Sequence, residues 1–413
     1  MALDLIRGAR TISRVELAER LGLTSAAITR IVRDLLDDGL VVEDGRGQST
    51  GGKPRTMLRL NPPSRYSVGV HLERNTCVVV VIDLAGEVVA RAALPGATSL
   101  PPQRMLSMLA DQIHALLTTA RIQLPAVVGL GLVTYGPQDW RAGVLLTPQP
   151  NPQWLDYPVT QQMSRLVHLP VLLDNDANAA AIGEYWLGGV DPASTFACLY
   201  LGTGIGGAVV VAGELYRGSS SNTVEIGHIS INSDGDPCSC GNRGCLESLA
   251  GPQAVVRQAW TTPLAQRLGL GPEAELHPRA VDPLNPPDST DYTDYLDLFE
   301  RITKAAGTGD PDAATLVQRS ARHLAQASIT LANLFDLDTI VLAGPGFGSA
   351  TTTYRDIIDA EINQSWFSRR AHSITVTPST NSSDAAAIGA AALVLQRELV
   401  RRSIGAPADR LSS

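Results

Sequence analysis

The stretch HISINSDGDPCSCGNRGCLE, residues 228–247, holds three of the five cysteines of the chain together with a histidine and a glutamate. Cys238, Cys240 and Cys245 with His228 form a Cys3His set, which is the ligand number and type of a closed tetrahedral Zn²⁺ site. Two glycines between the cysteines allow the chain to turn tightly enough for the sulfurs to converge on one ion. A redox pair of cysteines or a chance cluster are the alternatives. A closed zinc site would be structural and would stiffen the backbone on either side.

Length and composition indicate a protein of more than one domain. The chain has 413 residues, which exceeds what one hydrophobic core usually holds. Hydrophobic residues make up 44% and charged residues 18%, and no apolar run is long enough to span a bilayer. The first residues lack the apolar segment of a signal peptide, so we expect a cytoplasmic protein without a membrane partner. Cys77 and Cys198 lie in separate apolar runs, which argues against a disulfide framework.

Positive charge is concentrated near the start of the chain. Residues 1–60 carry ten Lys and Arg against eight Asp and Glu, whereas the other residues carry 23 against 33. The excess is sharpest in GRGQSTGGKPRTMLRL, residues 45–60, which has four cations and no anion. Taken alone, such a stretch could be a solvated linker.

The residues before this basic stretch predict a helix-turn-helix. SRVELAERLGL predicts a short helix that ends at Gly22, and Thr24 or Ser25 can cap a second helix. Apolar residues of the second helix recur at helical spacing and form one buried face: Ile28, Ile31, Val32, Leu35 and Leu36. The strand-like runs DDGLVVEDG and MLRLNP follow, on either side of the basic loop. This order predicts a winged helix-turn-helix domain over residues 1–62.

The face opposite the apolar stripe suits contact with DNA. Short side chains near the start of the helix allow close approach to the major groove, and arginines further along can reach guanine edges or phosphates. The alternative is a three-helix packing module that does not contact DNA. The predicted DNA-binding residues, including two from the wing, are Ser25, Ala26, Thr29, Arg30, Arg33, Lys53 and Arg55.

Beyond residue 65, apolar strand-like runs alternate with helical patterns. YSVGVHL, TCVVVVIDL and VVARAAL predict three strands, and LPVLLDND predicts a strand that leads into a helix. FACLYLGTGIGGAVVVAGELYRG then predicts a hairpin of two strands. This alternation predicts an α/β architecture with partly parallel sheets. The segment DPLNPPDSTDYTD, residues 282–294, reads as a loop insertion.

The motifs EIGHISI, CSCGNRGCLE, DNDANAAAIGE and GTGIGG resemble those of the ROK family, which contains repressors, sugar kinases and uncharacterised reading frames. The N-terminal part resembles the repressor branch, whose members respond to sugars. The resemblance covers the chain from Val15 to about Leu399 and implies two ribonuclease-H-like lobes of the actin/hexokinase type. We expect residues 65–180, with helix 384–400 packed back onto them, to form the small lobe. Residues 181–383 would form the large lobe with the zinc site.

The resemblance also implies a sugar site between the lobes. DNDAN aligns with the family motif that supplies an asparagine and an aspartate to the sugar, here Asn175 and Asp176. Asp176 would be the catalytic base in a kinase and a hydrogen-bond acceptor in a sensor. By the same resemblance Glu225, His228 and Glu247 contact the sugar, with His228 using one ring nitrogen for zinc and the other for a hydroxyl. The alternative for each residue is a buried polar group with a structural role.

The phosphate-binding half of a kinase site is incomplete. GTGIGGA keeps a glycine turn whose backbone N–H groups could hold phosphates, with Gly202, Thr203, Gly204 and Gly206. Sugar kinases of the family have a D-x-G-G-T-K type turn after the first strand, where this chain has HLERNT. His71 replaces the acidic residue, Glu73 and Arg74 replace glycines, and Asn75 replaces the threonine. On the adenosine side of the site, the turn AGPGFG differs less from the glycine-rich turn of the family's sugar kinases. We therefore do not expect ATP and Mg²⁺ to bind productively.

These features predict a sugar-responsive regulator of transcription, a repressor, with a sugar pocket derived from a kinase. A bifunctional sugar kinase that also binds DNA is the alternative. A third hypothesis, a protein-interaction module on an inactive kinase fold, does not explain why five sugar-contact positions are filled. The expected partners are operator DNA, a monosaccharide and further copies of the chain in a dimer or a dimer of dimers.

Overall fold

The structure is a computed structural model that describes residues 2–46, 55–98, 100–148, 150–187, 189–191, 193–271 and 295–403. Its N-terminal part contains three helices and a three-stranded sheet of order β1-β3-β2. The elements are α1 (Ala2–Ala9), β1 (Ile12–Ser13), α2 (Arg14–Leu21), α3 (Ser25–Asp37), β2 (Val41–Arg46) and β3 (Thr56–Leu60). This is the predicted winged helix-turn-helix, preceded by a helix, α1, that the sequence pattern did not indicate.

Local capping explains where the helices of this domain begin and end. Ser13 and Glu16 form a capping box at the start of α2, and Gly22 ends that helix in the left-handed conformation, with φ of 62°. The side chain of Thr24 accepts a hydrogen bond from the backbone of Ala27 and caps α3. Ile28 on the predicted apolar face is buried. The turn between α2 and α3 is therefore fixed by sequence signals within twelve residues.

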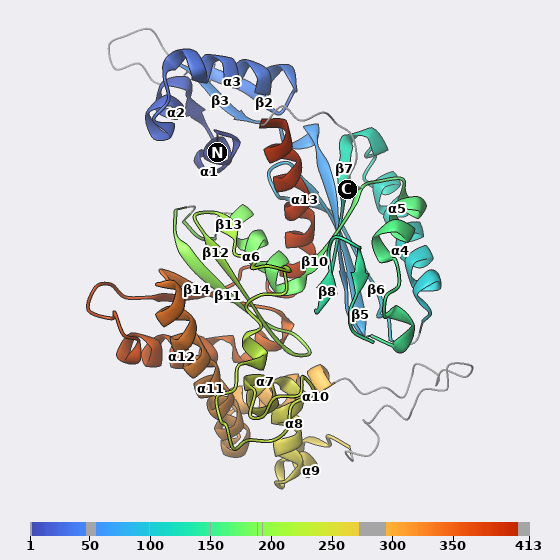
Figure 1. Ribbon diagram of the computed structural model, residues 1–413, viewed down its shortest axis with the longest axis vertical. Coiled ribbons are helices and arrows are strands. Elements are labelled where there is room, and N and C mark those ends of the chain that lie inside the picture. Colours follow the sequence, from blue (N-terminus) through green and yellow to red (C-terminus); the bar gives the residue numbers. More distant parts are fainter. Residues whose placement is uncertain are drawn as a thin grey trace.

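The first lobe contains a five-stranded sheet of order β10-β7-β4-β5-β6 (Figure 1). Strands β4, β5 and β6 are antiparallel neighbours, while β7 and β10 run parallel to β4. Helices α4 and α5 cover the face of this sheet that is turned away from α13. The elements are β4 (Tyr66–Leu72), β5 (Thr76–Asp83), β6 (Val88–Pro95), α4 (Pro102–Thr119), β7 (Val127–Thr134), β8 (Gln138–Asp139), β9 (Val144–Leu145), α5 (Val159–Val167) and β10 (Val171–Asn175).

The second lobe contains a sheet of order β13-β12-β11-β14-β15 and a group of helices beside it. Strands β11 and β12 form the predicted hairpin, and β14 runs parallel to β11. Its strands are β11 (Thr195–Leu201), β12 (Ile205–Val211), β13 (Glu214–Leu215), β14 (Thr339–Ala343) and β15 (Thr375–Pro378). Its helices are α7 (Leu246–Ala250), α8 (Pro252–Trp260), α9 (Leu264–Leu268), α10 (Tyr295–Gly307), α11 (Pro311–Phe335) and α12 (Thr351–Ser365).

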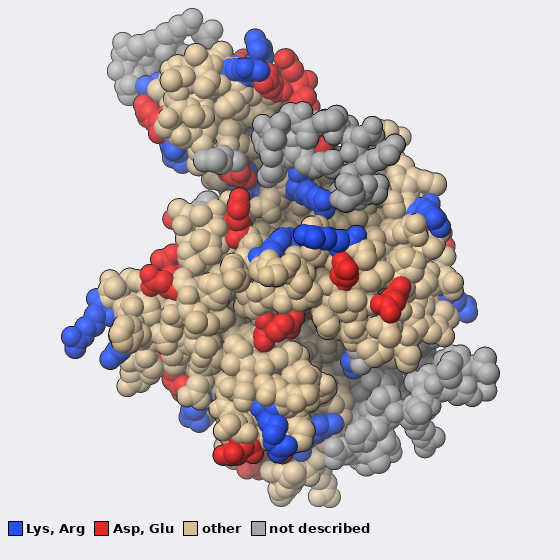
Figure 2. All heavy atoms as spheres, in the orientation of Figure 1, with Lys and Arg blue, Asp and Glu red and all other residues tan. Residues whose placement is uncertain are grey.

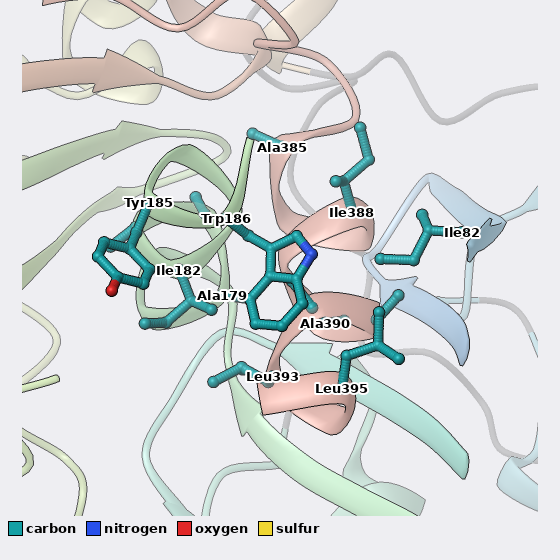
Figure 3. Packing of buried hydrophobic residues seen from close by; sticks show 14 of the residues in the cluster. Ile82, Ala179, Ile182, Tyr185, Trp186, Ala385, Ile388, Ala390, Leu393 and Leu395 are labelled. Atoms are coloured by element: carbon teal, nitrogen blue, oxygen red, sulfur yellow. The ribbon is translucent and has the colours of Figure 1, made fainter. Parts of the chain in front are cut away.

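Helices α6 (Asp176–Trp186) and α13 (Ala385–Ser403) lie against each other between the two sheets (Figures 1 and 3). The two backbones come into contact, because a Cβ atom on Gly389 would overlap the carbonyl oxygen of Ala179. A Cβ atom on Gly183 would lie 3.2 Å from the Cα atom of Gly389. Small residues at this crossing permit the close packing, and every residue of α6 is buried. Both lobes are thus joined through one helix pair.

The predicted loop insertion at residues 282–294 and the predicted wing residue Lys53 lie outside the described residues. Within the described ranges, no helix has the length and apolar character needed to cross a bilayer.

Candidate functional site

The candidate sugar site lies where parallel strands of the first sheet end. Strands β4, β7 and β10 end beside one another, and ligands of open α/β sheets bind at such carboxyl-terminal edges. Tyr135 and Gly136 follow β7, and Asn175 and Asp176 stand at the junction of β10 with α6. The turn between β11 and β12 contributes from the second lobe, since the Cβ position of Gly202 is 3.5 Å from the Glu73 carboxylate of the first lobe.

Asn175 and Glu225 converge on one point of this site. A Cβ atom on Gly136 would lie 3.5 Å from Glu225 Oε1 and 3.6 Å from Asn175 Nδ2. The same position is 3.6 Å from Oδ1 of Asn222, a residue that the sequence motifs did not indicate. Asn222 also pairs with the backbone of Gln138 through hydrogen bonds of 2.8 and 2.9 Å. In the sequence, only the position of Asn222 three residues before the E-x-G-H motif could have indicated that it belongs to the site.

Asn175 is held by the start of helix α6. Its side-chain oxygen accepts hydrogen bonds from the backbone N–H groups of Ala177, at 2.8 Å, and Asn178, at 3.3 Å, and so caps the helix. The amide nitrogen is then the atom directed toward Gly136 and Glu225. The preceding residue, Asp174, stabilises the junction of β10 with α6, because its buried carboxylate contacts the Arg217 guanidinium at 2.7 Å.

Asp176 is the next residue and is buried, with 7% of its surface exposed. One carboxylate oxygen, Oδ1, accepts a hydrogen bond from the backbone of Ala177 at 2.8 Å. The other, Oδ2, lies 3.8 Å from Nε2 of His71 at the end of β4. The carboxylate stands at the N-terminus of α6, where the helix dipole favours negative charge.

Glu247 takes a position that the motif alone did not define. Its Oε2 atom accepts a hydrogen bond from the backbone N–H of Ile205 at 2.8 Å and lies against Gly204. Glu247 thus holds the glycine turn between β11 and β12.

The acidic residues of the site affect one another. Burial raises the pKa of Glu225; the charge of His228 opposes this shift, while Asp176 and Glu247 add to it. The carboxylates of Asp176, Glu225 and Glu247 are therefore near enough to interact.

The predicted metal ligands come together in the structure. Nδ1 of His228 lies 3.6 Å from Sγ of Cys238, and Sγ of Cys240 lies 3.7 Å from Sγ of Cys245. The ligand atoms of all four residues lie within 4.8 Å of one another. In a tetrahedral zinc site with Zn–S bonds of about 2.3 Å and a Zn–N bond of about 2.0 Å, neighbouring ligand atoms are about 3.5–3.8 Å apart. The group can therefore bind a metal ion such as zinc.

The metal-ligand cluster is adjacent to the candidate sugar site. His228 ends a short 3-10 helix, Ile226–His228, that begins directly after Glu225. Cys245 immediately precedes α7, which carries Glu247. Because Nδ1 of His228 faces the sulfurs, Nε2 is the ring nitrogen left for a hydroxyl. A bound ion would hold this histidine and both flanking segments in fixed positions.

The candidate DNA interface is the outer face of α3. Ser25, Ala26, Thr29, Arg30 and Arg33 are all exposed, as the helical pattern predicted. Figure 2 shows both basic and acidic side chains on the face of this domain that is in view. Of the two predicted wing residues, Arg55 is described and exposed. The exposed surface of α3 is thus available for contact with a partner.

Two family profiles match the chain. One, described as the ROK family, matches residues 67–397, and one for winged helix-turn-helix DNA-binding matches residues 2–42. The xylose repressor of Bacillus subtilis is 32% identical over 60% of this chain and 64% of its own length. The chain thus matches less than two thirds of the length of that repressor.

A kinase is also among the relatives. The glucokinase of Halalkalibacterium halodurans is 30% identical over 81% of this chain and 96% of its own length. The crystal structure of a ROK family transcriptional regulator, a homologue of the Escherichia coli MLC protein, covers 95% of this chain and 94% of its own. Its TM-score is 0.69 at 23% identity, which shows the same fold.

We predict that the purified protein contains about one zinc ion per chain and that Cys240→Ser loses it. Removing one of four ligands opens a closed tetrahedral site and lowers its affinity. Elemental analysis measures the metal. Asp236→Asn, an exposed residue of the same loop outside the ligand set, is the control and should keep the ion. Full zinc content in Cys240→Ser, or none in the wild type, would refute this assignment.

We predict that Arg30→Ala weakens binding to a DNA site selected from a random library by about 1–3 kcal/mol, as expected for loss of a base contact. Lys53→Ala should instead reduce the salt dependence of binding, because a phosphate contact releases counterions. Fluorescence anisotropy measures both. Arg104→Ala, an exposed arginine on α4, is the control for a general loss of positive charge. Unchanged affinity in an Arg30→Ala/Lys53→Ala variant would contradict the placement of the interface.

Proposed function

Because the chain belongs to the ROK family, we propose that it is a DNA-binding regulator of transcription, a repressor, whose affinity for its operator is controlled by a monosaccharide. The similarity to a xylose repressor supports this function and suggests a sugar of that size as a first candidate. The observation that carries the proposal is structural. The winged helix domain shares one continuous hydrophobic cluster with α6, the helix whose first turn carries Asp176.

The contact between α1 and α6 is close and specific. Ile6 is fully buried, and the guanidinium of Arg7 lies 3.8 Å from the centre of the Trp186 ring. Arg7 also lies 5.7 Å from the ring of Tyr185 and 3.6 Å from Asp4. Such a cation–π contact contributes about 0.5–2 kcal/mol. Tyr185 and Trp186, which are labelled in Figure 3, are the last two residues of α6, whereas Asp176 is its first.

This arrangement supports a direct route from sugar to DNA. Sugar bound between the lobes would draw them together and move α6 relative to the first sheet. Because α1 packs on the far end of α6, the winged helix domain would move with it. We also propose that the chain forms a dimer or a dimer of dimers. The distance between the two α3 helices would then no longer match the distance between the two DNA half-sites. A coupling of about 1–3 kcal/mol between the sugar and DNA sites would suffice for regulation.

We further propose that the metal is a structural zinc ion on which sugar affinity depends. Glu225 and His228 are separated by two residues, and Glu247 follows Cys245 by two. A zinc ion on the four ligands would fix the relative positions of these side chains. Its contribution is to orient His228 and both glutamates, since a closed site has no open position for a reacting group.

The same geometry supports binding without phosphoryl transfer. Oε1 of Glu73 lies 3.5 Å from the Cβ position of Gly202, so a buried carboxylate adjoins the turn that would hold phosphates. Negative charge and a bulky side chain at this point oppose the approach of a phosphate. Without phosphoryl transfer, Asp176 would not act as the catalytic base of a kinase. It would instead accept a hydrogen bond from a sugar hydroxyl.

A bifunctional kinase is the second candidate. It is favoured by the similarity to a glucokinase and by a polar pocket beside β14 at the position of the adenosine-side turn. Residues that line this pocket include Gly344, Thr351, Ser379, Asn381 and Ser382. The pocket leaves room for a nucleoside, but it does not replace the missing phosphate turn.

We predict that a monosaccharide raises the melting temperature of the protein and is not phosphorylated at a useful rate. A ligand at 100 times its Kd adds about 2.7 kcal/mol to stability, so a panel of sugars screened by thermal shift identifies the effector. The sugar is then incubated with protein, ATP and Mg²⁺, and sugar phosphate is measured. Asp176→Asn is the control, because it should weaken sugar binding and abolish any transfer. Turnover of about 1–100 per second would favour the bifunctional kinase.

A further inference from the structure

His71 is a buried histidine at the point where β4 enters the cleft. It is 4% exposed, and it lies on the same face of the strand as Gly69, which contacts α13. Nε2 has no hydrogen-bond partner among the described residues. The distance of 3.8 Å to Oδ2 of Asp176 exceeds that of a hydrogen bond. Two buried polar atoms thus face each other without direct contact.

Other buried polar groups lie around this pair. The ring of Tyr200 packs edge-on against His71, with ring centres 6.2 Å apart. The hydroxyl groups of Tyr200 and Thr134 are buried and have no partner among the described residues. Most buried polar groups in folded proteins are hydrogen-bonded, so such a concentration in one place calls for an explanation. A polar ligand in contact with this wall of the cleft would supply the hydrogen bonds.

We propose that His71 is a sugar-binding and specificity-determining residue that, together with Asp176, recognises one hydroxyl group of the effector. An oxygen atom can lie about 2.8 Å from both Nε2 of His71 and Oδ2 of Asp176, since these atoms are 3.8 Å apart. The hydroxyl oxygen accepts a hydrogen bond from Nε2–H of His71 and donates its hydrogen to Asp176. This inference rests on the proposed sugar-binding function and adds a ligand contact to it.

The charges around His71 support its role as a donor. Burial lowers the pKa of His71, but the neighbouring carboxylate of Asp176 and the charges of Glu73 and Asp384 outweigh burial and raise the pKa overall. Because Nε2 faces the Asp176 carboxylate, a hydrogen on this ring nitrogen is favoured. Oδ1 of Asp176 is already occupied by the backbone of Ala177, which leaves Oδ2 for the ligand. Donor and acceptor are thus assigned to different atoms, and a hydroxyl group satisfies both.

The proposal also explains why this chain has a histidine at this position. A site that pairs a buried donor with a buried acceptor binds a hydroxyl and rejects an analogue that lacks it, because both partners then remain unpaired. His71 would thereby exclude sugars without a hydroxyl group at the matching carbon. A purely structural role, in which His71 only packs against Tyr200, predicts no such selectivity.

The test combines changes in the sugar with changes at His71 and measures binding for each combination. The effector found by thermal shift and its monodeoxy analogues are titrated by calorimetry into the wild type, His71→Phe and His71→Gln. We expect one analogue to bind the wild type at least about 100-fold more weakly than the parent sugar. His71→Phe should weaken the parent about 10- to 100-fold and reduce the discrimination against that analogue alone to below about 10-fold. His71→Gln offers an N–H donor and should therefore restore part of the affinity for the parent sugar and part of the discrimination against that analogue.

Asn222→Ser is the control at the other wall of the pocket, and it should leave discrimination at the hydroxyl read by His71 unchanged. Equal loss of affinity for the parent sugar and every analogue in His71→Phe and His71→Gln would overturn the inference and leave a structural role. Wild-type selectivity that persists in His71→Phe would overturn it as well. If no monosaccharide binds the wild type, the proposed function fails together with this inference, and that result is distinct from the other two.

Discussion

The backbone contact between α6 and α13 sets how the two sheets and the winged helix domain can pack. Gly389 and Gly183 permit the two helices to touch, and any side chain at Gly389 would meet the carbonyl oxygen of Ala179. Because the crossing is this close, the first sheet, the second sheet and the winged helix domain all pack on one helix pair. Helix α6 begins at Asp176 in the cleft and ends at Trp186 beneath α1, so a single rigid element touches both candidate binding sites.

Acidic side chains, two of them buried, give the cleft its chemical character. Asp176, Glu225, Glu247 and Glu73 stand around it, and each is directed by a short-range contact with a backbone group, a neighbouring turn or His71. Such a surface offers many acceptors and few cations, which suits a neutral polyhydroxylated ligand better than a phosphate ester. A metal ion on the four-residue cluster would fix the two segments that bring Glu225 and Glu247 to the cleft. The proposed sugar recognition and the proposed loss of phosphate binding would therefore have a common origin.

Features encoded by neighbouring residues could be predicted from the sequence. The end of α2 at Gly22, the four metal-ligand residues and the hairpin of β11 with β12 depend on local patterns, and the structure agrees with them. Helix α1 was missed because its eight residues carry no recognisable cap. The hydrogen bond from Ile205 to Glu247 and the pair of His71 with Asp176 join residues 42 and 105 positions apart. No local pattern predicts such contacts, so the cleft could be only partly predicted.

We have proposed that α6 couples sugar binding to DNA binding. Operator affinity can be measured by fluorescence anisotropy, with and without the effector sugar, in the wild type and in Arg7→Met. This substitution keeps an apolar stem at the contact with Trp186 and removes the cation. We expect the sugar to weaken operator binding by about 5- to 150-fold in the wild type and by much less in Arg7→Met, while each ligand alone still binds. An equal effect of the sugar in both proteins would show that α6 does not couple the two sites.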